Sequence, residues 1–196
     1  MASVSINKPF SNIVWFDCFD SNDIKTLNIA IKHELGISGV LEEKTSHAQM
    51  VESDQEKSGI FFKVPFTDSL MQLLSIWMGV CMKKNMDYFG FDIDWHWPIL
   101  SFNYNIYGVG DGYGWHTDVS SAFGTDIKLT FILDLSEKEY EGGDFQLIGQ
   151  PENHFVDTFN PGTTIAFASP LAHRVTPVTK GERITMSFWA PGTPWR

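Results

Sequence analysis

The chain has 196 residues, a formal net charge of −10 at pH 7 and 14 Lys and Arg residues without a dense basic run. These totals fit one globular domain, and they make nucleic-acid binding an unlikely function because such proteins present a basic face. Two cysteines, Cys18 and Cys81, lie far apart, and the N-terminus lacks a signal-peptide pattern. No apolar run approaches the ~20 residues of a membrane helix. We therefore expect a cytoplasmic protein without membrane association, while its oligomeric state stays open.

Two helices and a strand are predicted in the first part of the chain. Residues 21–35 repeat apolar side chains at helical spacing, with Ser21 as the expected N-cap and Gly36 at the end. Residues 67–88 are apolar on most faces and long enough for a helix that packs against a sheet. The apolar run at residues 12–19 predicts an early strand.

From residue 91 onward, short β-rich segments alternate with Gly, Pro, Asn and Asp. About eight strands within roughly 90 residues indicate two antiparallel sheets closed on each other. The predicted strands lie at residues 101–107, 113–118, 128–135, 143–148, 154–159, 163–168, 173–178 and 182–190. We expect a mostly β protein with flanking helices and a double-stranded β-helix core, which is the jelly-roll or cupin-like fold. The expected division is a single domain over residues 1–196, with an α/β flank at 1–90 and the core at 91–196.

The segment YGVGDGYGWHTD, residues 107–118, is rich in glycine but does not fit a phosphate-binding loop. It lacks the GxxxxGK[ST] pattern, and the residues after its glycines are strand-like rather than helical. Residues two apart on a strand point to the same face, so His116 and Asp118 present an imidazole and a carboxylate side by side. Such a pair alone is more often a surface contact. With His173 from a later strand, it would complete a two-histidine, one-carboxylate set that suits Fe(II).

Two further residues suggest an anion site next to this metal site. Arg183 follows His173 by ten residues across an expected hairpin at Lys180–Gly181, which would bring both residues to one cavity. The planar guanidinium of Arg183 suits a carboxylate, and its burial without an anion would be costly, so a dicarboxylate cosubstrate would explain it. The hydroxyl of Tyr107 could share the same anion. Taken alone, an arginine such as Arg183 is more commonly a surface turn residue, and a tyrosine such as Tyr107 is more commonly a core aromatic residue.

The order and spacing of these residues resemble a known family. Tyr107, Gly110, Tyr113, His116 and Asp118 match the YxxGxxYxxHxD pattern of the prolyl 4-hydroxylase-like branch of Fe(II)- and 2-oxoglutarate-dependent dioxygenases. Three more segments are similar to this branch and especially to its PKHD-type members. They are residues 140–145 (YEGGDF), 160–178 and 180–189. The resemblance covers about residues 100–190, and the first 90 residues carry no motif of the family.

The resemblance implies a role for five residues. His116, Asp118 and His173 would be the catalytic iron ligands, Arg183 would anchor the distal carboxylate of 2-oxoglutarate, and Tyr107 would give that cosubstrate a second hydrogen bond. The carboxylate of Asp118 also favours hydroxylation, because halogenating relatives lack it.

The resemblance supports weaker expectations for five other residues. Thr130 and Thr185 would assist in binding the cosubstrate. Tyr113 and Trp115, which precede the first iron ligand, would shape the mouth of the cavity, and Trp189 would face inward toward the substrate.

The resemblance further implies Fe(II), 2-oxoglutarate and dioxygen as the reactive groups, with ascorbate in a supporting role. The expected reaction hydroxylates an unactivated C–H bond on a protein or peptide residue such as proline. The alternative is hydroxylation of a free amino acid or small metabolite. Residues 42–59, a polar stretch expected to be a mobile loop, and residues 119–127 are candidates for a lid.

Two other classes of function compete with this interpretation. A non-catalytic jelly-roll binding module predicts a damaged triad or a lost arginine, and the sequence shows neither. A cupin-type hydrolase or isomerase with two metal-binding histidines would not need Arg183 and Tyr107 together.

Overall fold

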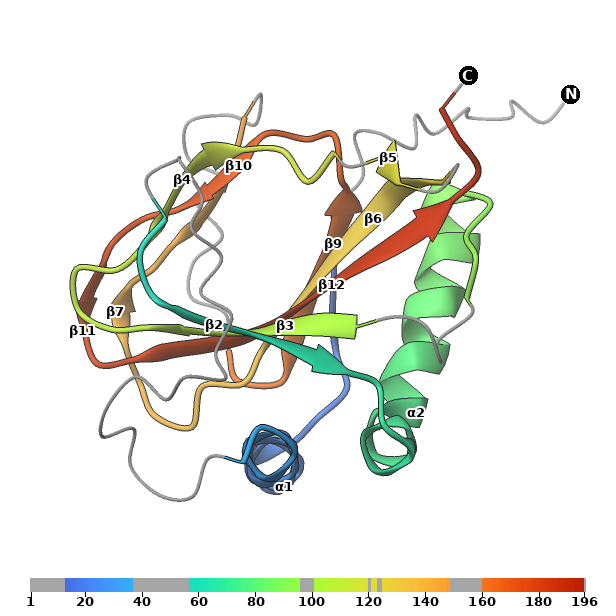
Figure 1. Ribbon diagram of the computed structural model, residues 1–196. Helices are drawn as coiled ribbons and strands as arrows, with labels where there is room; N and C mark the ends of the chain where they lie inside the picture. The colour runs from blue at the N-terminus through green and yellow to red at the C-terminus, as the bar shows by residue number, and fades with distance from the viewer. Residues whose placement is uncertain are drawn as a thin grey trace, which may run out of the picture.

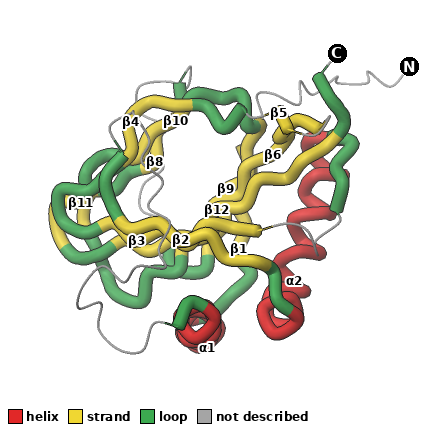
Figure 2. Tube along the Cα trace, in the orientation of Figure 1, coloured by secondary structure: helices red, strands yellow, loops and turns green. Residues whose placement is uncertain are grey.

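The computed structural model describes residues 13–36, 57–95, 101–119, 121–122, 125–148 and 160–195. Two β-sheets face each other, and the helices α1 (Ser21–Glu34) and α2 (Asp68–Lys84) lie outside the larger sheet (Figures 1 and 2). Within the described part of the chain, neither helix is long and apolar enough to cross a membrane.

The larger sheet has seven strands in the order β1-β9-β6-β12-β3-β2, with β5 paired to β6. Every pairing in it is antiparallel. Its strands are β1 (Ile13–Asp17), β2 (Ile60–Pro65), β3 (Ser101–Tyr107), β5 (Ser121–Ala122), β6 (Thr125–Asp134), β9 (Thr163–Ala168) and β12 (Arg183–Gly192).

The smaller sheet has the order β4-β10-β8, and a separate antiparallel pair is formed by β11 and β7. These strands are β4 (Tyr113–His116), β7 (Glu141–Gly142), β8 (Phe145–Leu147), β10 (His173–Val175) and β11 (Val178–Lys180). Buried side chains from β6, β8, β9 and β10 form one cluster between the two sheets. The expected jelly-roll core with flanking helices is confirmed.

Side chains along the strands of the larger sheet alternate between two faces, one toward the helices and one toward the smaller sheet. On β12, Ile184, Met186 and Phe188 join the large core cluster that also includes buried residues of both helices. The residues between them point to the opposite face, toward the smaller sheet, because strand side chains alternate. The helix side of this sheet is therefore apolar, while its other side is free to carry polar groups.

The helix boundaries are close to those expected, with one correction. Ser21 is not the N-cap of α1: the cap is Asp20, whose carboxylate accepts from the backbone N–H groups of Asn22 and Asp23 at 2.8 and 3.0 Å. The carboxylate of Asp23 accepts from the Asp20 N–H in return, so the pair forms a capping box. The second predicted helix is present as α2 followed by a π-helical turn, η1 (Asn85–Phe89).

Two buried polar contacts tie the helices to the larger sheet. The fully buried indole of Trp77 on α2 donates to the Thr164 hydroxyl at 2.9 Å. On α1, the Asn28 amide donates to the Leu135 carbonyl at 2.9 Å and accepts from the Tyr104 hydroxyl at 2.8 Å. Because these groups are buried, each contact fixes the position of a helix over the sheet as well as stabilising it.

Three features differ from the sequence-based expectations. The strand β2 was not predicted; β1 and β2 form the two opposite edges of the larger sheet, so the flank contributes to the core sheet. The expected hairpin between the strands of His173 and Arg183 is wrong, because β10 pairs with β4 and β8 whereas β12 pairs with β3 and β6. The strand expected at 154–159 and most of the loop expected at 42–59 lie outside the described residues.

We predict that Asn28→Ala lowers the free energy of unfolding by about 1–3 kcal/mol, because it leaves the buried Tyr104 hydroxyl and Leu135 carbonyl without their partner. Urea denaturation measures the change, and Lys25→Ala, an exposed position on the same helix, is the matched control. Equal stability of both variants would contradict the structural role of Asn28.

Candidate metal and carboxylate site

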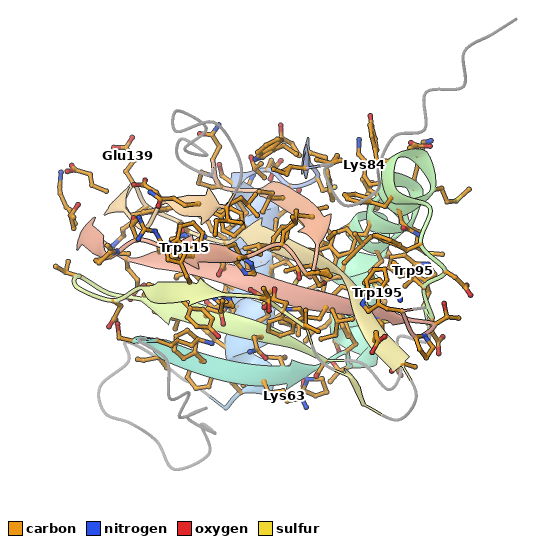
Figure 3. The ribbon with its side chains drawn as sticks, turned by 90° about the horizontal axis from the view of Figure 1, so that it is seen from above. Lys63, Lys84, Trp95, Trp115, Glu139 and Trp195 are labelled. Atoms are coloured by element: carbon orange, nitrogen blue, oxygen red, sulfur yellow. The ribbon has the colours of Figure 1, made fainter. Side chains whose placement is uncertain are left out.

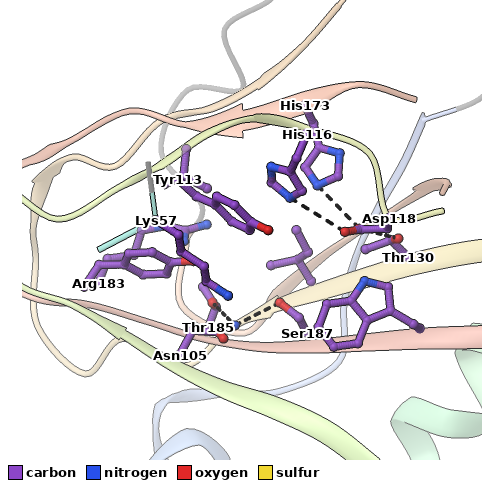
Figure 4. A pocket seen from close by; sticks show the side chains of 14 residues that line it. Lys57, Asn105, Tyr113, His116, Asp118, Thr130, His173, Arg183, Thr185 and Ser187 are labelled. Carbon is purple, nitrogen blue, oxygen red and sulfur yellow. Dashed lines mark hydrogen bonds and ion pairs between the residues drawn. The ribbon is translucent and has the colours of Figure 1, made fainter. Parts of the chain in front are cut away.

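Three potential metal ligands meet between the two sheets. His116 on β4 and His173 on β10 are direct cross-strand partners, and Asp118 follows two residues after His116. Each side chain offers one nitrogen or oxygen atom as a ligand, and these three atoms lie within 4.8 Å of one another. The Asp118 carboxylate lies 3.6 Å from Nε2 of His116 and 3.4 Å from Nε2 of His173 (Figure 4).

Backbone contacts orient both imidazole rings. Nδ1 of His116 lies 2.8 Å from the Gly114 carbonyl, and Nδ1 of His173 lies 2.9 Å from the Leu171 carbonyl. A proton on Nδ1 satisfies each carbonyl and leaves the Nε2 lone pair for a metal. Burial, and secondarily the neighbouring His173 ring, lowers the pKa of His116 and so favours its neutral form.

The carboxylate of Asp118 is oriented by hydroxyl groups of the larger sheet. The Thr130 hydroxyl donates to Oδ2 of Asp118 at 2.7 Å and is itself 3.0 Å from the Ser169 hydroxyl. The Asp118 N–H also donates to the Ser169 carbonyl at 3.0 Å. Thr130, which was expected to assist the cosubstrate, thus contacts the potential metal ligand Asp118 directly.

The donor set fits a non-haem iron ion. Two imidazoles and one carboxylate on one side of a metal leave positions on its other side for further ligands, as in Fe(II) oxygenase sites. Hydrogen bonds from neighbouring groups already orient each donor, which is the usual arrangement around a metal-binding histidine or carboxylate.

Arg183 lies at the opposite end of the same space, at the start of β12. It is 1% exposed, and it is paired in register with Tyr107 on β3, whose ring centroid lies 5.5 Å from the guanidinium carbon. The buried carboxylate of Asp134 accepts from the Tyr140 hydroxyl at 2.9 Å. Burial raises the pKa of Asp134, and the charge of Arg183 opposes this rise. Burial also raises the pKa of Tyr107, so its hydroxyl stays protonated and can donate.

A glycine makes room for the Arg183 side chain. Gly143 has a φ of +66°, and a Cβ built on it would lie 2.8 Å from Cδ of Arg183 and 3.1 Å from Cγ2 of Val178. Another residue would therefore be strained in its backbone and would displace the arginine. This close approach gives a physical reason for the second glycine of the YEGGDF segment.

One cavity joins the triad to Arg183. Fourteen residues line it: Lys57, Asn105, Tyr107, Tyr113, His116, Asp118, Thr130, Ile132, His173, Val175, Arg183, Thr185, Ser187 and Trp189. Tyr107, Tyr113, Thr185 and Trp189 thus lie where the sequence placed them, although their functional roles stay predictions. Tyr113 stacks on His116 with ring centroids 3.5 Å apart.

Trp115 lies elsewhere. It is 44% exposed and is not one of the side chains that line the cavity. The guanidinium of Arg174, also outside the cavity lining, lies 4.9 Å from its ring centroid. Because Trp115 is one residue from His116 on β4, strand alternation directs the two side chains to opposite faces.

The sequence reasoning missed several polar residues of the cavity. The Asn105 amide donates to the hydroxyls of Thr185 and Ser187 at 3.2 and 2.9 Å. Alternation along β3 and β12 from Tyr107 and Arg183 could have identified Asn105 and Ser187. Lys57 also reaches the cavity, but it precedes β2 at the end of a polar stretch and carries no comparable sequence signal.

Residues 102–191 match the family described as the 2OG-Fe(II) oxygenase superfamily. A PKHD-type hydroxylase of Picosynechococcus sp. is 37% identical over 87 residues, which are 44% of this chain and 39% of that protein. A PKHD-type hydroxylase of Aliarcobacter butzleri is 36% identical over 98 residues, 46% of this chain and 43% of that protein. These matches span about two fifths of the length of the curated relatives.

Solved structures share the fold at low sequence identity. A Pseudomonas putida prolyl-4-hydroxylase has a TM-score of 0.66 and 14% identity, with 93% of each chain covered. A prolyl hydroxylase from Trichoplax adhaerens, in complex with a peptide fragment of the hypoxia inducible factor oxygen degradation domain, has a TM-score of 0.63 and 18% identity, covering 91% of this chain and 82% of that chain. Over residues 102–191, which include His116, Asp118 and His173, the chain is thus similar to the 2OG-Fe(II) oxygenase superfamily and to PKHD-type hydroxylases.

Proposed function

We propose that this protein is an Fe(II)- and 2-oxoglutarate-dependent dioxygenase that hydroxylates an unactivated C–H bond. The observation that carries the proposal is the shared cavity, which has the side chains of His116, Asp118 and His173 at one end and the buried guanidinium of Arg183 at the other. A ligand that chelates a metal through one end and carries a carboxylate at the other end fits this arrangement, and 2-oxoglutarate is such a ligand.

The residues of the chain have distinct parts in this proposal. His116, Asp118 and His173 hold the iron, which with 2-oxoglutarate and dioxygen supplies the oxidative chemistry when bound. Arg183 binds the distal carboxylate through its planar donors, and the neutral Tyr107 hydroxyl donates to the same group. The two sheets enclose these groups and so exclude bulk water from the reacting centre.

The competing classes explain the cavity less well. A non-catalytic binding module has no need for two imidazoles whose Nε2 atoms are held toward one carboxylate. A metal-dependent hydrolase or isomerase uses the metal site but has no need for a buried arginine held beside Tyr107 in the same cavity.

We further propose that the target is a protein or peptide residue, with proline as the first choice, and that a free amino acid or small metabolite is the alternative. The similarity to PKHD-type hydroxylases and the prolyl hydroxylase fold support this choice. A second hollow shares Tyr113 and Val175 with the cavity and continues along Gly110, Gly112 and Pro177. This hollow fits an extended peptide, because Gly110 and Gly112 have no side chains to cover the protein backbone there.

Fe(II)-dependent conversion of 2-oxoglutarate to succinate tests the activity. We expect Asp118→Ala to reduce this conversion to background, because the metal loses its carboxylate ligand. Glu139→Ala, which removes an exposed carboxylate at the edge of the molecule (Figure 3), is the control and should leave the rate unchanged. Wild-type turnover by Asp118→Ala would exclude the proposed triad.

Arg183→Lys tests the carboxylate anchor. The variant keeps the charge but loses the planar pair of donors, so we expect the 2-oxoglutarate concentration at half-maximal succinate formation to rise about tenfold or more. Metal affinity, measured by calorimetry, should stay close to that of the wild type. Lys63→Gln, which removes an exposed charge on β2 outside both hollows, is the control. An equal loss of metal and 2-oxoglutarate affinity in Arg183→Lys would argue against the anchor.

The substrate class is tested by stimulation of 2-oxoglutarate turnover. We expect proline-containing peptides to stimulate succinate formation more than free proline or other free amino acids do, because a peptide can also occupy the adjoining hollow. Asp118→Ala with the same peptides controls for contaminating activity. Stimulation by free amino acids alone would favour the small-molecule alternative.

A further inference from the structure

Lys57 enters the cavity from outside the strands that build it. It lies before β2 and forms an isolated antiparallel bridge with Tyr113, the residue that stacks on His116. Its side chain lines the cavity together with the triad and Arg183, and Figure 4 shows it between Tyr113 and Arg183. A second cationic side chain is thus present in the space proposed for the cosubstrate.

Aromatic rings surround the ammonium group of Lys57. Its Nζ lies 3.7 Å from the ring centroid of Phe61 and 4.6 Å from that of Tyr113. Within the part of the chain that the structure describes, no carboxylate lies within ion-pair distance of it. Burial lowers the pKa of Lys57 to about 8, although the charge of Asp118 opposes the shift. A partly buried cation gains free energy when an anion binds within ion-pair distance of it.

The charged side chains that line the cavity indicate how many carboxylates its ligand carries. Lys57 and Arg183 both bring a positive charge to the cavity, and Asp118 is the one carboxylate among the described residues that line it. A ligand with two carboxylates can pair with both cations, whereas without Lys57 only Arg183 would remain to pair with it.

We propose that Lys57 is a second carboxylate-binding residue of this cavity and acts together with Arg183. This inference rests on the proposed function. The carboxylate belongs either to the 2-oxoglutarate dianion, which the two cationic side chains of the lining favour, or to the target. In both cases the ammonium group moves away from the rings of Phe61 and Tyr113 until it reaches a carboxylate oxygen.

A purely structural role is the alternative explanation. In that case Lys57 would only pack on Phe61 and Tyr113, and a neutral side chain of similar length would preserve ligand binding. Lys57→Gln keeps most of the length and the polarity but removes the charge, so it separates the two explanations.

The test is calorimetric titration of 2-oxoglutarate into protein loaded with Mn(II), which occupies nitrogen and oxygen sites like those of Fe(II). We expect Lys57→Gln to weaken 2-oxoglutarate binding about tenfold or more, because a charged hydrogen bond is lost. Lys63→Gln is the matched control: it removes the same charge from an exposed position on β2 (Figure 3) and should bind like the wild type.

A second titration identifies the source of the carboxylate. N-acetylglycine, a small carboxylate with a peptide-like amide, is titrated into protein already saturated with Mn(II) and 2-oxoglutarate. Weaker 2-oxoglutarate binding by Lys57→Gln assigns the carboxylate to the cosubstrate. Weaker binding of N-acetylglycine alone assigns it to the target.

The pH dependence provides an independent readout. The lysine is cationic below its pKa, so the advantage of the wild type over Lys57→Gln should be full below pH 8 and shrink as the pH rises above about 8. A ratio of the two affinities that does not change with pH would contradict charge-based binding. The other titratable groups that line the cavity are Tyr107, Tyr113, His116, Asp118, His173 and Arg183.

The outcomes separate this inference from the proposed function. If Lys57→Gln binds both ligands as tightly as the wild type, while the wild type binds 2-oxoglutarate in an Arg183-dependent manner, the role of Lys57 is wrong and the proposed function stands. If the wild type does not bind 2-oxoglutarate at all, both are wrong.

Discussion

The two-residue period of β12 is the constraint on which the rest of the structure depends. It directs Ile184, Met186 and Phe188 into the core beneath the helices and the alternate residues, beginning with Arg183, into the cavity. A shift of one residue would exchange the two sets and place a guanidinium in the apolar core. The large apolar core therefore fixes the face of the sheet on which Arg183 lies.

The metal site depends on contacts between the two sheets. The cross-strand pair of His116 and His173 belongs to the smaller sheet, while the hydroxyl that orients Asp118 comes from Thr130 on β6 of the larger sheet. Metal binding by these three residues would therefore depend on how the two sheets face each other. The helices hold the larger sheet from behind, so they contribute to the site through the position of Thr130 and Arg183.

Many of the residues that line the cavity could be predicted from the sequence, whereas several packing details could not. Strand alternation and the spacing to His173 and Arg183 predicted residues that do line one cavity. The expected hairpin before Arg183 failed because strand pairing in a jelly roll is non-local, and local turn residues do not decide it. Lys57 was missed because its position depends on contacts with Phe61 and Tyr113, which no local pattern encodes.

The central claim is that one cavity binds a metal at the triad and a carboxylate at Arg183. A crystal structure of the protein with Mn(II) and 2-oxoglutarate tests it most directly. We predict an anomalous peak at bonding distance from Nε2 of His116, the Asp118 carboxylate and Nε2 of His173, with the distal carboxylate of the ligand on the guanidinium of Arg183. A metal bound at another site, or a ligand whose distal carboxylate points away from Arg183, would contradict the account.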